Sequence, residues 1–95
     1  MVKINWTPQS KIDLVSIAEF IAQDSQKFAR IQIKRIRERV KQLKKFPNSG
    51  RRVPEYGDDS LKELILGNYR IIYRLRSGDR IDSITVHHSA KRLRI

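Results

Sequence analysis

Cysteine is absent from this sequence of 95 residues. Its absence excludes disulfides, thiolate metal sites and cysteine nucleophiles. The sequence also lacks any apolar run approaching the length of a membrane span, and its first residues lack the apolar segment of a signal peptide. We therefore expect a cytoplasmic protein without membrane association, and no motif indicates a cofactor.

Acidic residues are scarce, with 10 Asp and Glu against 21 Lys and Arg, which gives a formal charge of +11. A charge of this size destabilises a small folded chain through self-repulsion. We expect a partner that neutralises it, which could be nucleic acid, an acidic protein or both. The alternative is a basic surface that serves only to keep the protein dissolved.

Length and hydropathy pattern predict one domain over residues 1–95, because apolar residues make up 39% of the chain. The element order is βααβββ, an α+β fold in which a helix hairpin packs on a small, curved, mainly antiparallel sheet. The predicted strands cover residues 2–6, 61–66, 69–76 and 81–87, and the predicted helices cover 8–23 and about 25–45, followed by a loop through residue 60.

Both helices carry start signals and one apolar stripe. Thr7 followed by Pro8 is a typical N-cap and first helical residue, and Asp24 or Ser25 can cap the second helix. The expected buried positions are Leu14, Ile17, Ala18 and Ile21 in the first helix, and Ala29, Ile33, Ile36, Val40 and Leu43 in the second. The rest of the second helix is densely basic. A charge run of this kind is usually a solvated face, but its single sign favours a long-range electrostatic role.

Strand alternation assigns side chains to two faces of the sheet. On the central strand, Tyr69, Ile71, Tyr73 and Leu75 share the face that should meet the helices, which makes Tyr73 a packing residue. The open face should carry Arg70, Ile72, Arg74 and Arg76. On the last strand, Ile84 and Val86 should point to the core, and Ser83, Thr85 and His87 should point away from it.

Arginine and histidine on one sheet face suit phosphate binding and stabilisation of a phosphorane-like transition state. The candidate catalytic residues are Arg70, His87, His88 and Lys62. Lys62 would join this face from the neighbouring strand, but the ambiguous pattern of residues 61–66 does not decide its side. The candidate nucleic-acid-binding residues are Arg51, Arg52, Arg74, Arg76, Lys91 and Arg92.

Each candidate also has a purely structural explanation. Arg70 could pair with Glu63 across the hairpin, and one histidine could simply pack at the sheet edge. The basic C-terminal residues Lys91 and Arg92 could belong to a frayed end. No metal site is expected, because adjacent residues such as His87 and His88 point to opposite faces of a strand.

In this order and spacing, several short motifs resemble the RelE/ParE superfamily, the toxins of bacterial type II toxin–antitoxin (plasmid stabilisation) modules. The motifs are Trp6-Thr7-Pro8, Phe46-Pro47-Asn48-Ser49-Gly50-Arg51, Val53-Pro54-Glu55, Lys62-Glu63-Leu64, Tyr69-Arg70-Ile71-Ile72-Tyr73-Arg74 and Val86-His87-His88. The resemblance spans almost the whole chain and implies a helix hairpin against a curved antiparallel sheet, as the periodicity also predicts.

The resemblance implies growth arrest by one of two routes. RelE-like members cleave mRNA in the ribosome with basic side chains instead of a metal, and Arg70 lies where RelE has an arginine implicated in catalysis. ParE-like members bind DNA gyrase and block replication without hydrolysis, and the long helix hairpin is more similar to theirs. We expect metal-independent, ribosome-dependent mRNA cleavage, with gyrase inhibition as the alternative and a non-toxic nucleic-acid-binding module as a third class.

In the nuclease mechanism a histidine would act as general acid or base, while Arg70, Arg74 and Lys62 would hold the scissile phosphate. Either toxin implies a cognate antitoxin, which we expect to be an acidic, partly disordered segment that folds along the basic helices and sheet edge. The resulting complex would be a toxin–antitoxin hetero-oligomer.

Overall fold

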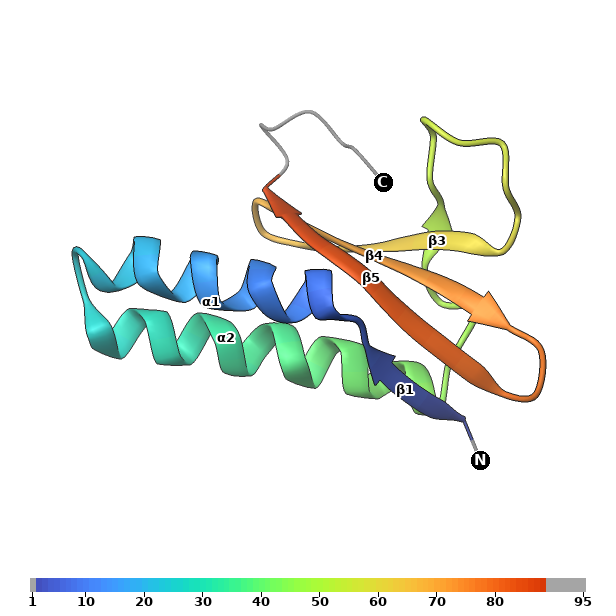
Figure 1. Cartoon of the computed structure of the whole chain (residues 1–95), viewed down its shortest axis with the longest axis horizontal. Helices are drawn as coiled ribbons and strands as arrows, with labels where there is room; N and C mark the ends of the chain where they lie inside the picture. The colour runs from blue at the N-terminus through green and yellow to red at the C-terminus, as the bar shows by residue number, and fades with distance from the viewer. Residues whose placement is uncertain (1, 89–95) are drawn as a thin grey trace.

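The computed structural model describes residues 2–88, apart from the side chain of Ile84. Within them, two helices pack on one face of a curved, five-stranded sheet (Figure 1). The elements are β1 (Lys3–Trp6), α1 (Pro8–Ala22), α2 (Gln26–Lys41), the 3₁₀ turn η1 (Gln42–Lys44), β2 (Arg51–Arg52), β3 (Leu61–Leu66), β4 (Tyr69–Arg76) and β5 (Arg80–His88). The predicted α+β class and helix hairpin are confirmed. Neither helix is long and apolar enough to cross a membrane.

The sheet has the strand order β1-β5-β4-β3-β2. The pairs β2–β3, β3–β4 and β4–β5 are antiparallel. Tight turns at Gly67 and Gly78 connect the last two pairs, and a longer loop connects β2 to β3. In contrast, β1 runs parallel to β5, and the long connection that a parallel pair needs is supplied by the two helices and the three strands between them. The short strand β2 lies inside the segment that the sequence predicted as loop.

The helix ends follow the predicted capping signals. The Thr7 hydroxyl accepts a hydrogen bond from the Ser10 backbone N–H at 3.2 Å, and Ser25 caps α2 through the Phe28 N–H at 3.1 Å. The α-helical part of α2 ends at Lys41, short of the predicted end, and η1 continues it to Lys44.

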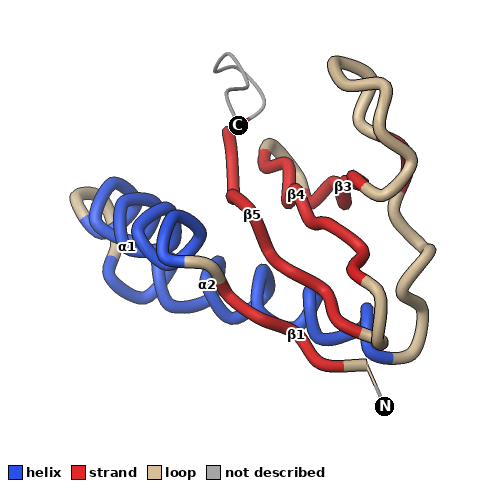
Figure 2. Tube along the Cα trace, turned by 45° about the vertical axis from the view of Figure 1, so that its right-hand side comes forward, coloured by secondary structure: helices blue, strands red, loops and turns tan. Residues whose placement is uncertain are grey.

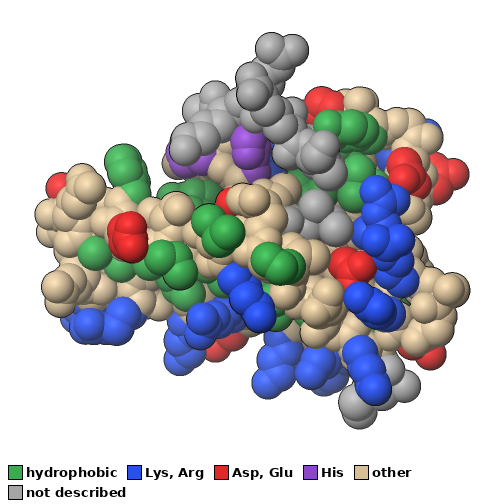
Figure 3. All heavy atoms as spheres, in the orientation of Figure 1, with side chains coloured by type: hydrophobic (Ala, Val, Ile, Leu, Met, Phe, Trp, Pro, Cys, Tyr) green, Lys and Arg blue, Asp and Glu red, His purple; other side chains and the backbone are tan. Residues whose placement is uncertain are grey.

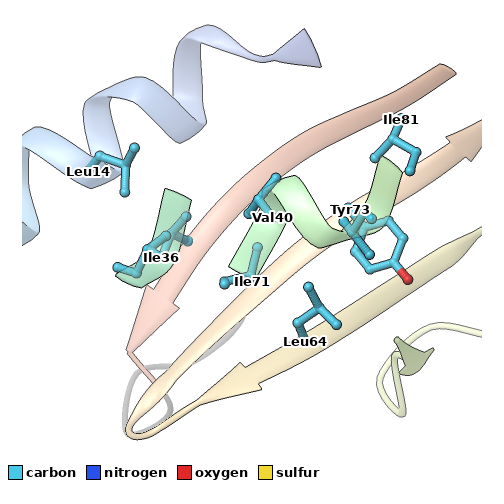
Figure 4. Packing of buried hydrophobic residues seen from close by; sticks show 9 residues of the cluster. Leu14, Ile36, Val40, Leu64, Ile71, Tyr73 and Ile81 are labelled. Carbon is cyan, nitrogen blue, oxygen red and sulfur yellow. The ribbon is translucent and has the colours of Figure 1, made fainter. Parts of the chain in front are cut away.

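The main core lies between the helices and the sheet. Figure 4 shows Leu14 of α1 and Ile36 and Val40 of α2 facing Ile71 and Tyr73 on the strands. The other predicted α1 positions, Ile17, Ala18 and Ile21, are only partly buried. Figure 1 shows the reason, because the far end of the helix hairpin projects past the edge of the sheet.

A β-bulge changes the predicted alternation of β5. Ile72 pairs with Thr85 but Tyr73 pairs with Ser83, so β5 has one residue more than β4 at this point. Ser83 is therefore fully buried opposite Tyr73, and its predicted outward direction is wrong. Thr85 is also buried, and its hydroxyl donates to the Asp13 carboxylate of α1. Val86 points to the core as predicted.

The loop between β2 and β3 covers part of the face that the sequence predicted to be open. Figure 2 shows this loop on the side of the sheet that faces away from the helices. Beneath it, Val53, Leu61 and Ile72 form a second buried cluster. Tyr73 anchors the segment just before β2 from the opposite face, because its hydroxyl donates to the Pro47 carbonyl and accepts from the Gly50 N–H, both at 3.0 Å.

Candidate functional site

Arg70 lies in the middle of the sheet face that points away from the helices. It pairs in register with Ile65 of β3 and His87 of β5, so all three side chains share this face. Only 12% of the Arg70 side chain is exposed. The predicted placement of Arg70 and His87 together is therefore confirmed.

Two carboxylates occupy the Arg70 guanidinium. Its Nη1 and Nη2 donate to the two oxygens of Glu55 at 2.6 and 2.8 Å, a bidentate pair. Its Nε and Nη2 both lie 2.6 Å from Oε2 of Glu63. Because a guanidinium has five N–H donors in a fixed fork, this arrangement leaves Arg70 little capacity for a phosphate.

Glu63 is the buried centre of this arrangement, since none of its side-chain surface is exposed. Its second oxygen, Oε1, accepts from the Nε of Arg51 at 2.6 Å. A buried carboxylate is stable only when it is paired and hydrogen-bonded, and here two guanidinium groups from β2 and β4 supply the partners. We call Arg51, Glu55, Glu63 and Arg70 the Arg70 network.

The pKa values of the network reflect the same contacts. The hydrogen bonds from Arg70 lower the pKa of Glu55 to about 2, although partial desolvation opposes the shift. The paired Glu55 carboxylate raises the pKa of Arg70 above its ordinary value. At neutral pH Glu55 is therefore ionised and paired with the charged Arg70.

The neighbouring arginines of the sheet are paired as well. Arg74 donates to Asp58 at 2.6 Å and to the Ser60 hydroxyl at 3.0 Å. Hydrogen bonds from Ser60 and then from Arg74 lower the pKa of Asp58 to about 2. These contacts hold the loop between β2 and β3 against the sheet.

Where β4 ends and β5 begins, Arg76 of β4 and Arg80 of β5 both bind the nearly buried Asp82, at 2.9 and 3.1 Å. Burial tends to raise the pKa of Asp82, but hydrogen bonds from Arg76, Asn5 and Arg80 outweigh it and lower the pKa. Arg52 forms a longer and more exposed pair with Asp59 at 3.4 Å. The sheet arginines are thus neutralised by the chain's own carboxylates.

The structure separates two of the candidate catalytic residues, Lys62 and His88, from Arg70. Lys62 pairs with Tyr73 and so lies on the face toward the helices, which makes its predicted place beside Arg70 wrong. The side chains of β3 alternate, and it is Glu63 that shares the face of Arg70. His88 pairs with Tyr69, and their rings meet edge to face with centroids 5.4 Å apart. Lys91 and Arg92 lie outside the described residues.

Sequence reasoning named Glu63 as a possible partner of Arg70 but missed Glu55, Asp58 and Asp82. The tight turn at Gly67 is a local signal that places Glu63 near Arg70 across the hairpin. Glu55 and Asp58 have no such signal, because a long loop brings them back over the sheet. Among residues 2–88, no cluster of three His, Asp or Glu could hold a metal ion.

A family model and a solved structure are similar to this chain. A family model described as the ParE toxin of type II toxin–antitoxin system, parDE, matches residues 4–93. A solved chain from a chromosomal ParDE TA system of P. aeruginosa is similar in structure, with a TM-score of 0.76 and 22% sequence identity. The match covers 93% of this chain and 96% of that one, and at this identity it establishes a shared fold. The search of curated proteins found no match.

Proposed function

Because the chain belongs to the ParE toxin family of type II toxin–antitoxin systems, we propose that it arrests growth by inhibiting DNA gyrase without hydrolytic chemistry. The sequence resemblance linked ParE-like members to gyrase and RelE-like members to mRNA cleavage. The family match over residues 4–93 favours the first route, which was the alternative in the sequence analysis.

The main support for gyrase inhibition over mRNA cleavage is that the Arg70 guanidinium is occupied by carboxylates. A ribonuclease that works without a metal needs cationic groups free to hold the scissile phosphate and its developing charge. The Arg70 guanidinium instead binds Glu55 and Glu63, and Arg74 binds Asp58. Lys62, the third candidate cation, lies on the opposite face of the sheet. This geometry supports a binding function better than phosphate chemistry.

A toxin of this family belongs to a module with an antitoxin, and the chain's charge of +11 suits an acidic antitoxin partner. We place both in the cytoplasm as a hetero-oligomer. Inhibition of gyrase then follows when the toxin is free of that partner.

Two assays on one toxin preparation test the proposal, with a heat-inactivated sample as control. We expect loss of gyrase supercoiling activity and intact mRNA in a cell-free translation reaction. A His87→Gln variant, which keeps polarity but cannot exchange a proton near neutral pH, should inhibit gyrase as the wild type does. Cleavage of ribosome-bound mRNA, abolished by His87→Gln, together with unaffected supercoiling would overturn the proposal in favour of the nuclease.

A further inference from the structure

The helix α2 and the turn η1 carry most of the molecule's uncompensated charge. Between Gln26 and Lys44 there are eight Lys or Arg residues and one Glu, a net charge of +7 out of the chain's +11. Figure 3 shows Lys and Arg side chains along the lower border of the molecule, where Figure 1 places α2. Among the described residues, no other element carries as large a share of the chain's net charge.

Six of these cations form one row. Their spacing along the chain is 3, 4, 3, 4 and 3 residues, so they follow one side of the helix next to its buried seam. We call this row the cationic stripe, and it consists of Lys27, Arg30, Lys34, Arg37, Lys41 and Lys44. All six are exposed. At 1.5 Å per residue, the stripe is about 26 Å long.

The stripe is not neutralised by the chain itself. Within the described residues its one ion pair joins Lys34 to Glu38 at 4.0 Å, and both side chains are more than 60% exposed. Such an exposed ion pair contributes little to the stability of the fold. Like charges at i, i+4 destabilise a helix, as between Arg30 and Lys34 or Arg37 and Lys41. The fold therefore bears a repulsion that a polyanionic partner would relieve.

We propose that the cationic stripe binds the sugar–phosphate backbone of duplex DNA. This inference rests on the proposed function, since gyrase acts on duplex DNA and a toxin bound there would lie beside it. Duplex DNA presents one negative charge per about 1.7 Å of its axis, so a straight row of cations about 26 Å long can meet several phosphates at once.

The length of the cationic stripe favours DNA over an acidic peptide. A peptide helix would use the apolar groove between α1 and α2, which Ala18, Ala22, Ala29 and Ile33 line. Three cations of the stripe line that groove together with Glu19 and Glu38, so a peptide helix seated there would reach only Arg30, Lys34 and Arg37. The stripe runs beyond the groove to Lys41 and Lys44, which lie near Ile4 and Trp6 of β1. Contact to phosphates alone would make the binding independent of base sequence.

The test is fluorescence anisotropy of a labelled mixed-sequence duplex of 24 base pairs, titrated with the free toxin at several salt concentrations. The stripe variant is Arg30→Gln/Lys34→Gln/Arg37→Gln. The matched control, Lys11→Gln/Arg35→Gln/Arg39→Gln, removes the same charge from α1 and from the other flank of α2. Circular dichroism of each variant confirms that it is folded before binding is compared.

We expect the stripe variant to lose roughly a hundredfold in affinity at moderate salt, and the slope of log K against log salt to fall by about 2.7 for three lost contacts. The control should lose much less. Equal losses in the two variants would overturn the proposal, because net charge alone would then explain binding. Wild-type binding to DNA by the stripe variant, combined with lost binding to an acidic antitoxin peptide, would overturn it in favour of a protein partner.

A supercoiling assay with the same three proteins separates this inference from the proposed function. If the wild type binds DNA through the stripe but leaves gyrase active, the proposed function fails and the DNA-binding inference stands. If the wild type inhibits gyrase and the stripe variant binds DNA as tightly as the wild type does, the inference fails and the proposed function stands.

Discussion

The arginines of the sheet and the cations of α2 are similar in number and chemistry but differ in their surroundings. Arg70 is largely buried and shares two carboxylates within the Arg70 network, whereas the cationic stripe faces water with one weak ion pair among the described residues. The difference comes from the neighbouring segments. The loop and the strands beside β4 place four carboxylates against its arginines, those of Glu55, Asp58, Glu63 and Asp82. Basic residues that look alike in a sequence can therefore be structural in one place and available for a partner in another.

The largest effect that tests this contrast is the loss of Arg70. Arg70→Met keeps much of the side-chain volume but removes one of the two partners of the buried Glu63. We expect a loss of about 3 kcal/mol in the free energy of unfolding, measured by urea denaturation, because an incompletely paired buried charge is costly.

The matched exposed substitution, Arg35→Met on α2, should change stability by less than about 0.5 kcal/mol. Similar losses in the two variants would mean that the Arg70 network is no more structural than the surface of α2.

Lowering the pH should reduce the free energy of unfolding through the Glu55 carboxylate of the Arg70 network. The pKa of Glu55 is held at about 2, below its ordinary value of 4.5, so the folded state binds its proton less readily than the unfolded chain. The stabilisation is complete above pH 4.5 and is lost as the pH falls toward 2. The exposure of Glu55 limits its share to less than about 1 kcal/mol.

Unfolding curves between pH 7 and pH 2 measure this effect. Glu55→Gln should flatten the decline in stability over that window, whereas Arg35→Gln should leave its slope unaltered. An unchanged decline in Glu55→Gln would contradict the assigned role of the Arg70–Glu55 contact.

The smallest effect concerns the repulsion along α2. Neutralising Arg30, Lys34 and Arg37 as glutamines should stabilise the free toxin by a few tenths of a kcal/mol at low salt, since each like-charged i, i+4 pair is destabilising by about 0.2–0.5 kcal/mol. The gain should disappear near 1 M salt, where the screening length is about 3 Å. Thermal unfolding at two salt concentrations checks it, and a gain that persists at high salt would point to helix propensity instead of charge.

Local patterns were enough to predict most of the fold. The caps at Thr7 and Ser25 and the turns around Gly67 and Gly78 are signals confined to a few residues, and the helices and hairpins begin and end close to the predicted places. The parallel pairing of β1 with β5 joins segments about 77 residues apart in the chain, so no local signal specifies it.

The candidate site was harder to predict, because the role of each residue depends on contacts with residues far away in the sequence. Alternation placed Arg70, Arg74 and His87 on one face, but it could not show that Glu55 and Asp58 return over that face from a loop. The bulge in β5 reversed the direction of Ser83, since one extra residue shifts every side chain before it to the other face. Lys62 was ambiguous because apolar residues occur on both faces of β3.

Trapped cleavage complexes most directly test the proposal that this toxin acts on gyrase. Relaxed plasmid would be incubated with purified gyrase, ATP and toxin, then treated with detergent and protease before electrophoresis. We predict linear plasmid that increases with toxin concentration and requires gyrase. Plasmid that gyrase supercoils at the normal rate, without linear product at any toxin concentration, would contradict the account.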